Sequence, residues 1–553
     1  MQQAPDVRVP VLVVGGSLVG LSTSLFLGRL GVEHLLVERH ASTSRHPRGR
    51  GNNLRTMELF RTAGIDDAIL DAAHLLTGNH GILQARTLTA GDDEWLVQGV
   101  QTADGSARVS PAAWCVCSQN DLEPVLLDHA RKLGGDLRFA TELLSFEQDA
   151  DGVTAVVEDR ESGRHLVVRA DYLVAADGPR SPVREQLGIG HSGPGDLFHN
   201  VSVTFRSRGM AAIVGDRRFI VCYLTEPGGD GALLPVDNAE QWVFHAPWQP
   251  EQGEKLEDFT DERLVAHIRR AAGDPGLDVE ITGRSPWHAA ERVADRYADG
   301  RVFLAGDSAH EMSPTGAFGS NTGIQDAHNL AWKLAAVLAG TAGPGLLGTY
   351  ERERRPVAVA TSARASARSR EHSHPGYAPG PGGGGKQRGM LAVAVGYRYR
   401  DGAVLGTDPA LPVVPEESEL RGEPGSRAPH LWLRRPGQQR PLSTLDLYER
   451  ELVLLTGTGT TAAADWQNGG AEAARRLGVP LAVHSLGTGE DADLVTEDGA
   501  DWAEAHGVTG DGALLVRPDG FVAWRAQGPV ADPARELTGV LTALLHREAG
   551  ARG

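Results

Sequence analysis

The sequence is poor in cysteine, and this scarcity limits what the protein can be. Its 553 residues contain 3 cysteines, Cys115, Cys117 and Cys222, which are too few for a disulfide framework and are typical of a reducing cytoplasm. Two of them follow a C-x-C spacing, and no histidine pair completes a zinc pattern. We therefore expect no metal site, and small buried side chains at all three positions.

Lysine and arginine are also scarce relative to the acidic residues. The chain has 54 Lys and Arg against 72 Asp and Glu, a formal net charge of -18. Such an acidic surface keeps a protein in solution and disfavours nucleic acid as a partner, because phosphate binding needs a basic face. The charge indicates no particular substrate, and the oligomeric state stays open between monomer and homodimer.

Long apolar runs are missing as well. The apolar stretch Val9–Val32 is rich in glycine, is interrupted by Arg29 and lacks both a basic leader and a cleavage site. It therefore predicts a buried strand, turn and helix, and not a signal peptide or a membrane span. We expect a cytoplasmic protein that makes no contact with a membrane.

What the sequence does contain predicts about three α/β units, at roughly 100–200 residues per domain. A βαβ opening comes first, and alternating segments between about His191 and Gly283 predict an inserted antiparallel sheet. Pro and Gly dominate His374–Gly389, which predicts a linker to a third unit. The opening is predicted as strand Arg8–Val14, helix Ser17–Leu30 and strand His34–Glu38, followed by a helix Leu122–Leu133 capped by Asn120 or Asp121, a hairpin of Thr154–Asp159 and His165–Arg169, and a separate strand Asp171–Ala176.

The turn after the first strand matches G-x-G-x-x-G over Gly15–Gly20, with Ser17 in place of the second glycine. The first glycine permits a tight turn, the last permits close packing, and the helix N-terminus then faces a pyrophosphate. Glu38 ends the second strand, where a carboxylate accepts hydrogen bonds from a ribose diol. The pattern predicts dinucleotide binding without separating FAD from NAD, and we expect Ser17 to be tolerated.

Two later motifs follow buried strands and favour FAD. The first is Asp177–Arg184 (DGPRSPVR), and the second is Gly306–His310 (GDSAH), which continues as Pro314–Asn321 (PTGAFGSN). An aspartate at the end of a strand can accept a hydrogen bond from a ribityl hydroxyl. The helix expected from about Ser320 to Leu338 would direct its positive end at a flavin ring and stabilise a flavin anion.

These three motifs, in this order, resemble class A FAD-dependent aromatic monooxygenases of the para-hydroxybenzoate hydroxylase fold over about residues 8–370. Gly425–His430, Ser443–Asp446 and Pro518–Gly520 resemble the thioredoxin-like extension of phenol hydroxylase. The resemblance implies an α/β fold with a Rossmann-like FAD-binding domain and an inserted antiparallel-sheet substrate domain. The expected domains are FAD-binding at 1–80, 109–190 and 284–373, substrate-binding at 81–108 and 191–283, a linker at 374–390, and a thioredoxin-like unit without redox cysteines at 391–553.

The resemblance also implies which residues contact the cofactors. Arg48 would meet the pyrophosphate, Gln119 would lie near the ribityl–pyrophosphate stretch, and Asp177 is associated with both FAD and NADPH. His310, Arg180 and Arg184 are interpreted more simply as packing or bracing residues. The full expected FAD set is Gly15, Ser17, Leu18, Val19, Gly20, Glu38, Arg39, Arg48, Gln119, Leu143, Asp177, Asp307, Pro314, Gly319, Ser320 and Asn321.

The chemistry implied by the resemblance belongs mostly to the flavin. NADPH or NADH would reduce FAD, dioxygen would add to give a C4a-hydroperoxide, and its distal oxygen would pass to an electron-rich ring. The three-part layout and Gly396–Tyr399 resemble tetracenomycin and anthracycline oxygenases, which implies a polycyclic phenol or quinone substrate and antibiotic biosynthesis. Candidate substrate-wall residues are Phe205, Tyr223, Trp242 and Phe244. The sequence assigns no catalytic acid or base.

Other functions remain open on the same scaffold. A Baeyer–Villiger reaction or another oxidative rearrangement would differ in product mass and ring opening. A non-catalytic FAD-binding protein would show no NADPH oxidation stimulated by polyphenols. A flavin halogenase is disfavoured, because its usual W-x-W-x-I-P motif is not found.

Overall fold

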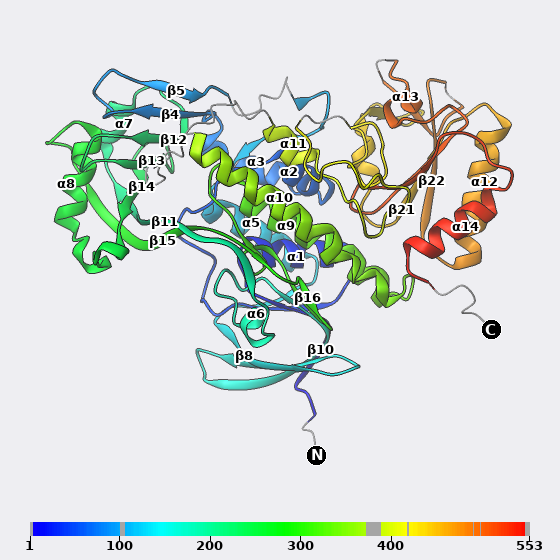
Figure 1. Cartoon of the computed structure of the whole chain (residues 1–553), viewed down its shortest axis with the longest axis horizontal. Helices are drawn as coiled ribbons and strands as arrows, with labels where there is room; N and C mark the ends of the chain where they lie inside the picture. Colours follow the sequence, from blue (N-terminus) through cyan, green and yellow to red (C-terminus); the bar gives the residue numbers. More distant parts are fainter. Residues whose placement is uncertain are drawn as a thin grey trace.

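The computed structural model describes residues 4–99, 106–371, 389–416, 420–489, 491–497 and 499–547. Most of the predicted linker, 374–388, lies outside the described residues. Figure 1 shows a sheet with its helices at the left, a central body crossed by the long helices α9 (Phe318–Leu338) and α10 (Thr349–Glu371), and a carboxy-terminal unit at the right. No helix in the described ranges is long and apolar enough to cross a membrane.

The first sheet brings the predicted βαβ opening and both later motif strands together. Its strands are β1 (Val7–Val14), β2 (His34–Val37), β7 (Asp136–Arg138), β8 (Thr141–Gln148), β9 (Val153–Asp159), β10 (Arg164–Ala175), β16 (Ala298–Asp299) and β17 (Val302–Leu304). β1, β10 and β17 are parallel, with Val14 opposite Ala175 and Ala175 opposite Leu304. Because parallel strands end at the same edge of a sheet, the turns after all three strands meet there.

Helices pack around this sheet, and all but the last of them contribute side chains to its hydrophobic core. They are α1 (Leu18–Arg29), α2 (Leu54–Thr62), α3 (Asp66–Ala72), α5 (Gln119–Lys132), α6 (Pro182–Gln186), α9 (Phe318–Leu338), α10 (Thr349–Glu371) and α11 (Met390–Val395). α1 and α9 approach closely, since a Cβ on either Gly306 or Gly323 would lie 2.6 Å from the Val19 side chain. Glycine at these two positions therefore lets the motif turns and α1 pack tightly.

Two predictions for this region were wrong in detail. α5 begins at Gln119 after Ser118, so Asn120 and Asp121 lie inside its first turn and do not cap it. The predicted hairpin strand at His165–Arg169 and the separate strand at Asp171–Ala176 form one strand, β10. Ala170 pairs with both Val153 and Val9, so the chain passes from the hairpin into the parallel sheet without a break.

The second sheet has the order β18-β15-β11-β14-β13-β12-β4-β5. Its strands are β4 (Gly81–Ala85), β5 (Glu94–Val97), β11 (His191–Arg206), β12 (Phe219–Leu224), β13 (Gly231–Pro235), β14 (Gln241–Trp248), β15 (Glu280–Ala294) and β18 (His310–Glu311). α7 (Arg208–Val214) and α8 (Asp261–Ala272) close a hydrophobic core on one face of it. β15 runs through position 284 without a break, and the predicted domain boundaries stay a prediction.

The carboxy-terminal unit is a mixed sheet between helices. Its strands are β19 (Trp432–Arg434), β20 (Leu442–Ser443), β21 (Leu452–Thr456), β22 (Leu481–Gly487), β23 (Leu494–Thr496), β24 (Ala513–Val516) and β25 (Val522–Ala526), with helices α12 (Thr461–Leu477), α13 (Trp502–His506) and α14 (Pro533–Leu544). β24 and β25 form the predicted hairpin. The likeness to thioredoxin remains a prediction. All three cysteines lie before this unit and are free and buried.

The smallest sheet supports the loop that carries Arg48. β3 (Gly51–Asn52) pairs with β6 (Cys115–Val116), and the Gly49 carbonyl accepts a hydrogen bond from the Gln119 backbone at 2.8 Å. The loop is therefore held against the start of α5.

Candidate functional site

The first motif has the geometry that its glycines predict. Gly15 has φ of +105°, and a Cβ there would lie 2.2 Å from the Ala176 carbonyl oxygen. A Cβ on Gly20 would lie 1.8 Å from the Gly15 carbonyl oxygen. Only glycine permits these approaches. The turn leads directly into α1, whose first N–H groups have no partner within the helix.

Ser17 does more than replace a glycine. Its hydroxyl donates to Glu123 Oε1 at 2.6 Å and accepts from Gln119 Nε2 at 2.9 Å. The other oxygen of Glu123 accepts the Ser44 backbone N–H at 2.8 Å, and the Glu123 side chain is fully buried. Ser17 therefore ties the glycine turn to α5 and to the loop before Arg48. Sequence reasoning missed Glu123, whose only signal is its position one turn after Gln119.

Glu38 holds the same turn from the second strand. Its Oε2 accepts the Gly16 backbone N–H at 2.6 Å, and its Oε1 accepts the His40 backbone N–H at 2.8 Å. The His40 ring nitrogen Nδ1 also lies 2.5 Å from Oε1. A carboxylate has about four acceptor positions, so Glu38 retains capacity for one ribose hydroxyl. The neighbouring Arg39 is exposed, and Leu143 on β8 packs at the margin of the first core.

The side chain of Asp177 in the second motif mainly stabilises the turn to which it belongs. Asp177 accepts from Ser181 Oγ at 2.6 Å and from the Val183 backbone N–H at 3.1 Å, and burial raises the pKa of its carboxyl. Arg184 is buried and donates to the carbonyls of Ser308 and Pro179, each at 3.0 Å. The bracing role expected of Arg184 is thus confirmed, and Arg184 joins the second motif to the third.

Buried contacts of Asp326 with His310 and Arg354 stabilise the third motif. His310 Nε2 lies 2.7 Å from Asp326 Oδ2, and Arg354 Nε donates to Asp326 Oδ1 at 2.7 Å. All three side chains are fully buried, so His310 packs and hydrogen-bonds as expected. Asp307 keeps exposed surface, yet desolvation by the protein around it raises the pKa of its carboxyl.

The turn before α9 is held in place by Asn321. Its Nδ2 donates to the Gly51 carbonyl at 2.8 Å, and its Oδ1 accepts the Asn53 backbone N–H at 2.9 Å. Gly319 is open, since a Cβ there would meet nothing within 4 Å. A Cβ on Gly49 would lie 3.8 Å from Ser320 Oγ, so the Arg48 loop and the α9 N-terminus are neighbours. Pro314 and Arg48 are both exposed.

The four candidate substrate-wall residues divide between the two faces of the second sheet. Phe205, Trp242 and Phe244 are fully buried in the core with α7 and α8, which assigns them a packing role. Tyr223 lies on the opposite face. That face contacts the loop that carries Arg48, because His46 Nε2 in this loop lies 2.8 Å from Ser202 Oγ. It also carries the ring pair His245 and Trp287, with centroids 5.3 Å apart.

These features fit a bound FAD along the edge of the first sheet. The glycine turn and the α1 N-terminus suit a pyrophosphate, Glu38 suits the ribose, and the α9 N-terminus suits the flavin ring. The open Gly319 leaves room for a ring against that helix end. No group of three potential metal ligands occurs in the part of the chain that the structure describes.

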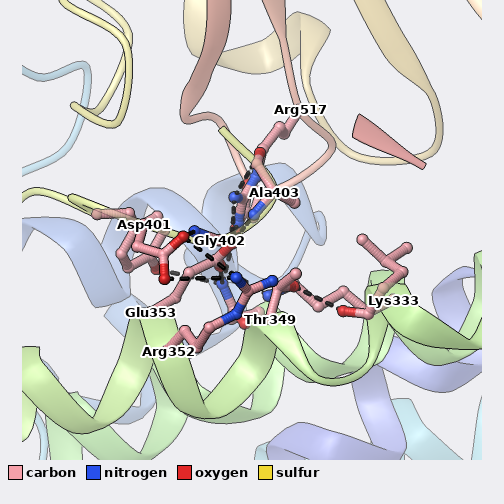
Figure 2. A network of polar contacts seen from close by, with 12 residues as sticks. Lys333, Thr349, Arg352, Glu353, Asp401, Gly402, Ala403 and Arg517 are labelled. Carbon is pink, nitrogen blue, oxygen red and sulfur yellow. Dashed lines mark hydrogen bonds and ion pairs between the residues drawn. The ribbon is translucent and has the colours of Figure 1, made fainter. Parts of the chain in front are cut away.

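A second cluster of charged side chains lies between this body and the carboxy-terminal unit (Figure 2). Glu353 of α10 accepts from Lys333 Nζ at 2.7 Å and from both terminal nitrogens of Arg517 at 2.7 and 2.8 Å. Asn329 Nδ2 donates to Glu353 at 2.7 Å and to Asp519 at 3.1 Å. We name Asn329, Lys333, Glu353, Arg517 and Asp519 the interdomain cluster.

The interdomain cluster is buried, and its charges shift one another's protonation. Burial lowers the pKa of the Lys333 amine to about 7. Arg517 and Lys333 overcome the opposing effect of burial and hold the pKa of Glu353 well below its usual range. Sequence reasoning assigned no role to Lys333 or Glu353. The available signal was a lysine in the apolar second half of α9, whereas Glu353 lies in a run of charged residues of α10 and gave no such signal.

Comparison with known proteins gives matches along almost the whole chain. Residues 8–365 match the family model described as "FAD binding domain", and residues 421–547 match "Aromatic-ring hydroxylase, C-terminal". A protein of Streptomyces halstedii assigned as a polyketide hydroxylase is 68% identical over 97% of each chain. Tetracenomycin A2 monooxygenase-dioxygenase of Streptomyces glaucescens is 41% identical over 99% of this chain and 98% of its own.

A solved structure resembles the whole molecule. The complex of aklavinone-11 hydroxylase with FAD and aklavinone superposes with a TM-score of 0.89 at 39% identity, covering 98% of this chain and 100% of that one. The likeness therefore includes both the motif-bearing body and the carboxy-terminal unit.

Proposed function

Because the chain belongs to the family of FAD-dependent aromatic-ring hydroxylases, we propose that it hydroxylates a polycyclic aromatic phenol or quinone of polyketide type. FAD, NADPH or NADH, and dioxygen are the cofactors and co-substrate. The observation that carries the proposal is the meeting of three motif turns at one edge of the first sheet, opposite the Tyr223 face of the second sheet. Antibiotic biosynthesis is the proposed setting, because the similar proteins include a tetracenomycin oxygenase and an aklavinone hydroxylase.

Bound FAD supplies the electron transfer and oxygen activation, and the chain supplies binding, orientation and exclusion of water. The glycine turn, Glu38 and Arg48 hold the adenosine and pyrophosphate portion. The α9 N-terminus orients the ring, with its positive end favouring negative charge there. The substrate lies between this ring and the second-sheet face that carries Tyr223.

The decisive experiment measures product and reductant together. The purified holoenzyme is given NADPH or NADH, dioxygen and a panel of polycyclic polyphenols, including aklavinone. Substrate-stimulated oxidation of the nicotinamide, with a product heavier by one oxygen atom and with rings intact, is expected. Absence of stimulated oxidation across the panel would favour a non-catalytic FAD-binding protein.

We also retain a second possible outcome of the reaction, because the tetracenomycin relative is named a monooxygenase-dioxygenase. A Baeyer–Villiger reaction or another oxidative rearrangement would give a lactone or an opened ring, which mass spectrometry of hydrolysed product distinguishes from a phenol. We further propose a cytoplasmic protein, supported by three free buried cysteines. It acts as a monomer or homodimer, which light scattering tests.

A further inference from the structure

Arg50 is a buried cation without a carboxylate partner. Its side chain is 7% exposed, and Nη1 donates to the Pro235 carbonyl. Nε and Nη2 have no hydrogen-bond partner among the described residues. Burial lowers the pKa of this guanidinium to about 10, so it remains charged at neutral pH. A buried charge without a partner is costly to a fold.

Four more deeply buried arginines show how the same fold can neutralise such a charge. Each makes an ion pair within the described residues: Arg55 and Arg427 with Glu58, Arg354 with Asp326, and Arg517 with Glu353 and Asp519. Arg50 differs from these four and resembles Arg184, which is also buried without an ion pair but donates to two backbone carbonyls. Arg50 is distinguished by two guanidinium nitrogens, Nε and Nη2, that have no partner among the described residues, and buried donors without partners call for an explanation such as a bound ligand.

The place of Arg50 indicates what it binds. It lies in the loop that carries Arg48, directly before β3, and it reaches Pro235 at the end of β13 in the second sheet. Its guanidinium therefore lies between the loop that carries Arg48, which is expected to contact FAD, and the second sheet, which is expected to contact the substrate. Arg48, two residues earlier, is exposed and is the expected pyrophosphate contact.

Nearby groups do not already supply the missing negative charge. Asp121 is the acidic group that most affects Arg50, but the two form no ion pair, and burial raises the pKa of Asp121. The pKa of His46 is lowered by burial and then by Arg48 and Arg50, so this ring is neutral at neutral pH. Arg48 and Arg50 both act on His46, so a ligand oxyanion at Arg50 would lie near two positive charges.

We propose that Arg50 binds an ionised phenol oxygen of the polycyclic substrate, through the two guanidinium nitrogens that have no partner in the protein. This inference rests on the proposed function for the chemical class of the substrate. A cation next to the oxygen favours its ionised form, and it thereby selects phenols over their ethers and raises the electron density of the ring.

The test uses the holoenzyme with two matched probes, 1,2-dihydroxyanthraquinone and its dimethyl ether. Ionisation of the first probe is followed by its visible absorption, and binding of both is followed by perturbation of the flavin spectrum. The wild type is expected to lower the apparent pKa of the bound phenol by about one unit or more. Arg50→Gln abolishes this shift and weakens binding of the ionised probe by about tenfold, whereas binding of the ether is unchanged.

Two further variants separate binding from folding. Arg50→Lys retains a cation and is expected to keep part of the shift, and Arg45→Gln removes an exposed arginine of the same loop and is expected to behave as wild type. Arg50→Gln is expected to keep FAD and to leave Tm unchanged or higher, because it removes an unpaired buried charge. A merely structural Arg50 would instead lower Tm and leave the probe shift intact.

Three results would overturn the proposal. One is an equal phenol shift in wild type and Arg50→Gln. The second is a changed flavin midpoint potential in Arg50→Gln without any change in probe ionisation, which would assign the guanidinium to the flavin. The third is failure of both probes to bind the wild type. If substrate still stimulates nicotinamide oxidation and the hydroxylated product forms in any of these cases, the proposed function is retained and only the role given to Arg50 is rejected.

Discussion

Ser17 illustrates how a single residue departs from a motif without weakening its geometry. The hydroxyl occupies the position of the second glycine and bonds both Gln119 and the buried Glu123. The small side chain preserves the approach that the motif needs, and its oxygen adds a connection that glycine lacks.

Ser17→Ala is expected to lower the stability of the protein, because the buried carboxylate of Glu123 loses one of its donors. A hydrogen bond to a charged group contributes about 1.5–3 kcal/mol, which thermal unfolding of the holoenzyme detects as a lower Tm. Ser42→Ala removes an exposed hydroxyl from the loop after β2 and serves as the control. Equal Tm values for the two variants would contradict the role given to Ser17.

Gly319→Ala tests whether the α9 N-terminus faces the flavin ring. A Cβ there meets nothing within 4 Å in the protein, so stability without FAD should be retained or slightly raised, as for other helical Gly→Ala changes. The dissociation constant for FAD is expected to rise about tenfold or more, a loss of about 1.4 kcal/mol. Gly539→Ala in α14 is equally open and should leave FAD binding unchanged; unaltered binding in both would remove Gly319 from the site.

At the scale of elements, α9 serves two sites with one helix. Its first turns carry Asn321, which fixes the helix start, and Asp326, which binds His310 and Arg354. Asn329 and Lys333 follow at helical spacing and enter the interdomain cluster. The flavin motifs and the carboxy-terminal unit are therefore connected through a single rigid element.

Asp326→Asn is expected to destabilise the protein by about 3–5 kcal/mol, because the buried Arg354 guanidinium keeps its charge without its carboxylate. Asp401→Asn is the matched control, since Asp401 pairs with Arg352 at an exposed position and such pairs contribute little. Thermal unfolding of both holoenzymes measures the difference. A similar small loss of stability in the two variants would show that the buried ion pair stabilises the protein no more than the exposed one.

At the scale of the whole molecule, the interdomain cluster attaches the carboxy-terminal unit to the flavin-binding body. Glu353 and Arg517 stand 164 positions apart in the sequence and form a two-point ion pair that is fully buried. Arg55 adds a second connection by donating to the Asp519 carbonyl. The unit is thus joined to the body through charges as well as apolar packing.

Acid is expected to loosen this attachment, and Glu353→Gln is expected to reduce the acid response. The pKa of Glu353 is lower in the fold than its usual value of about 4.3, so its stabilising effect is complete above that value. The effect declines as pH falls further towards the folded pKa. Tm measured from pH 7 to 3 should fall for wild type below about pH 4.

The variant should begin with a lower Tm at pH 7, by the equivalent of about 3–5 kcal/mol, because Lys333 and Arg517 lose their shared carboxylate. Its further loss in acid should be smaller than that of wild type. Glu536→Gln, at an exposed position of α14, controls for the loss of one carboxylate. Parallel acid profiles for wild type and Glu353→Gln would exclude Glu353 as the titrating group.

The sequence by itself determined the three motif turns, the buried strands that precede them and the kind of cofactor that they suit. These features depend on local requirements, such as the positive φ of Gly15 and an aspartate directly after a buried strand. Spacing along the chain was enough to predict them, and the family matches confirm the fold and the cofactor.

Only the tertiary structure decided which side of the second sheet faces the motifs and which charges meet. The alternating pattern placed Phe205 and Tyr223 in strands correctly but could not say which face is covered by α7 and α8. Likewise, Arg50 without a carboxylate and Glu353 between two cations depend on residues distant in sequence. Their partners are selected by the packing of whole elements, and this packing leaves no periodic signal in the chain.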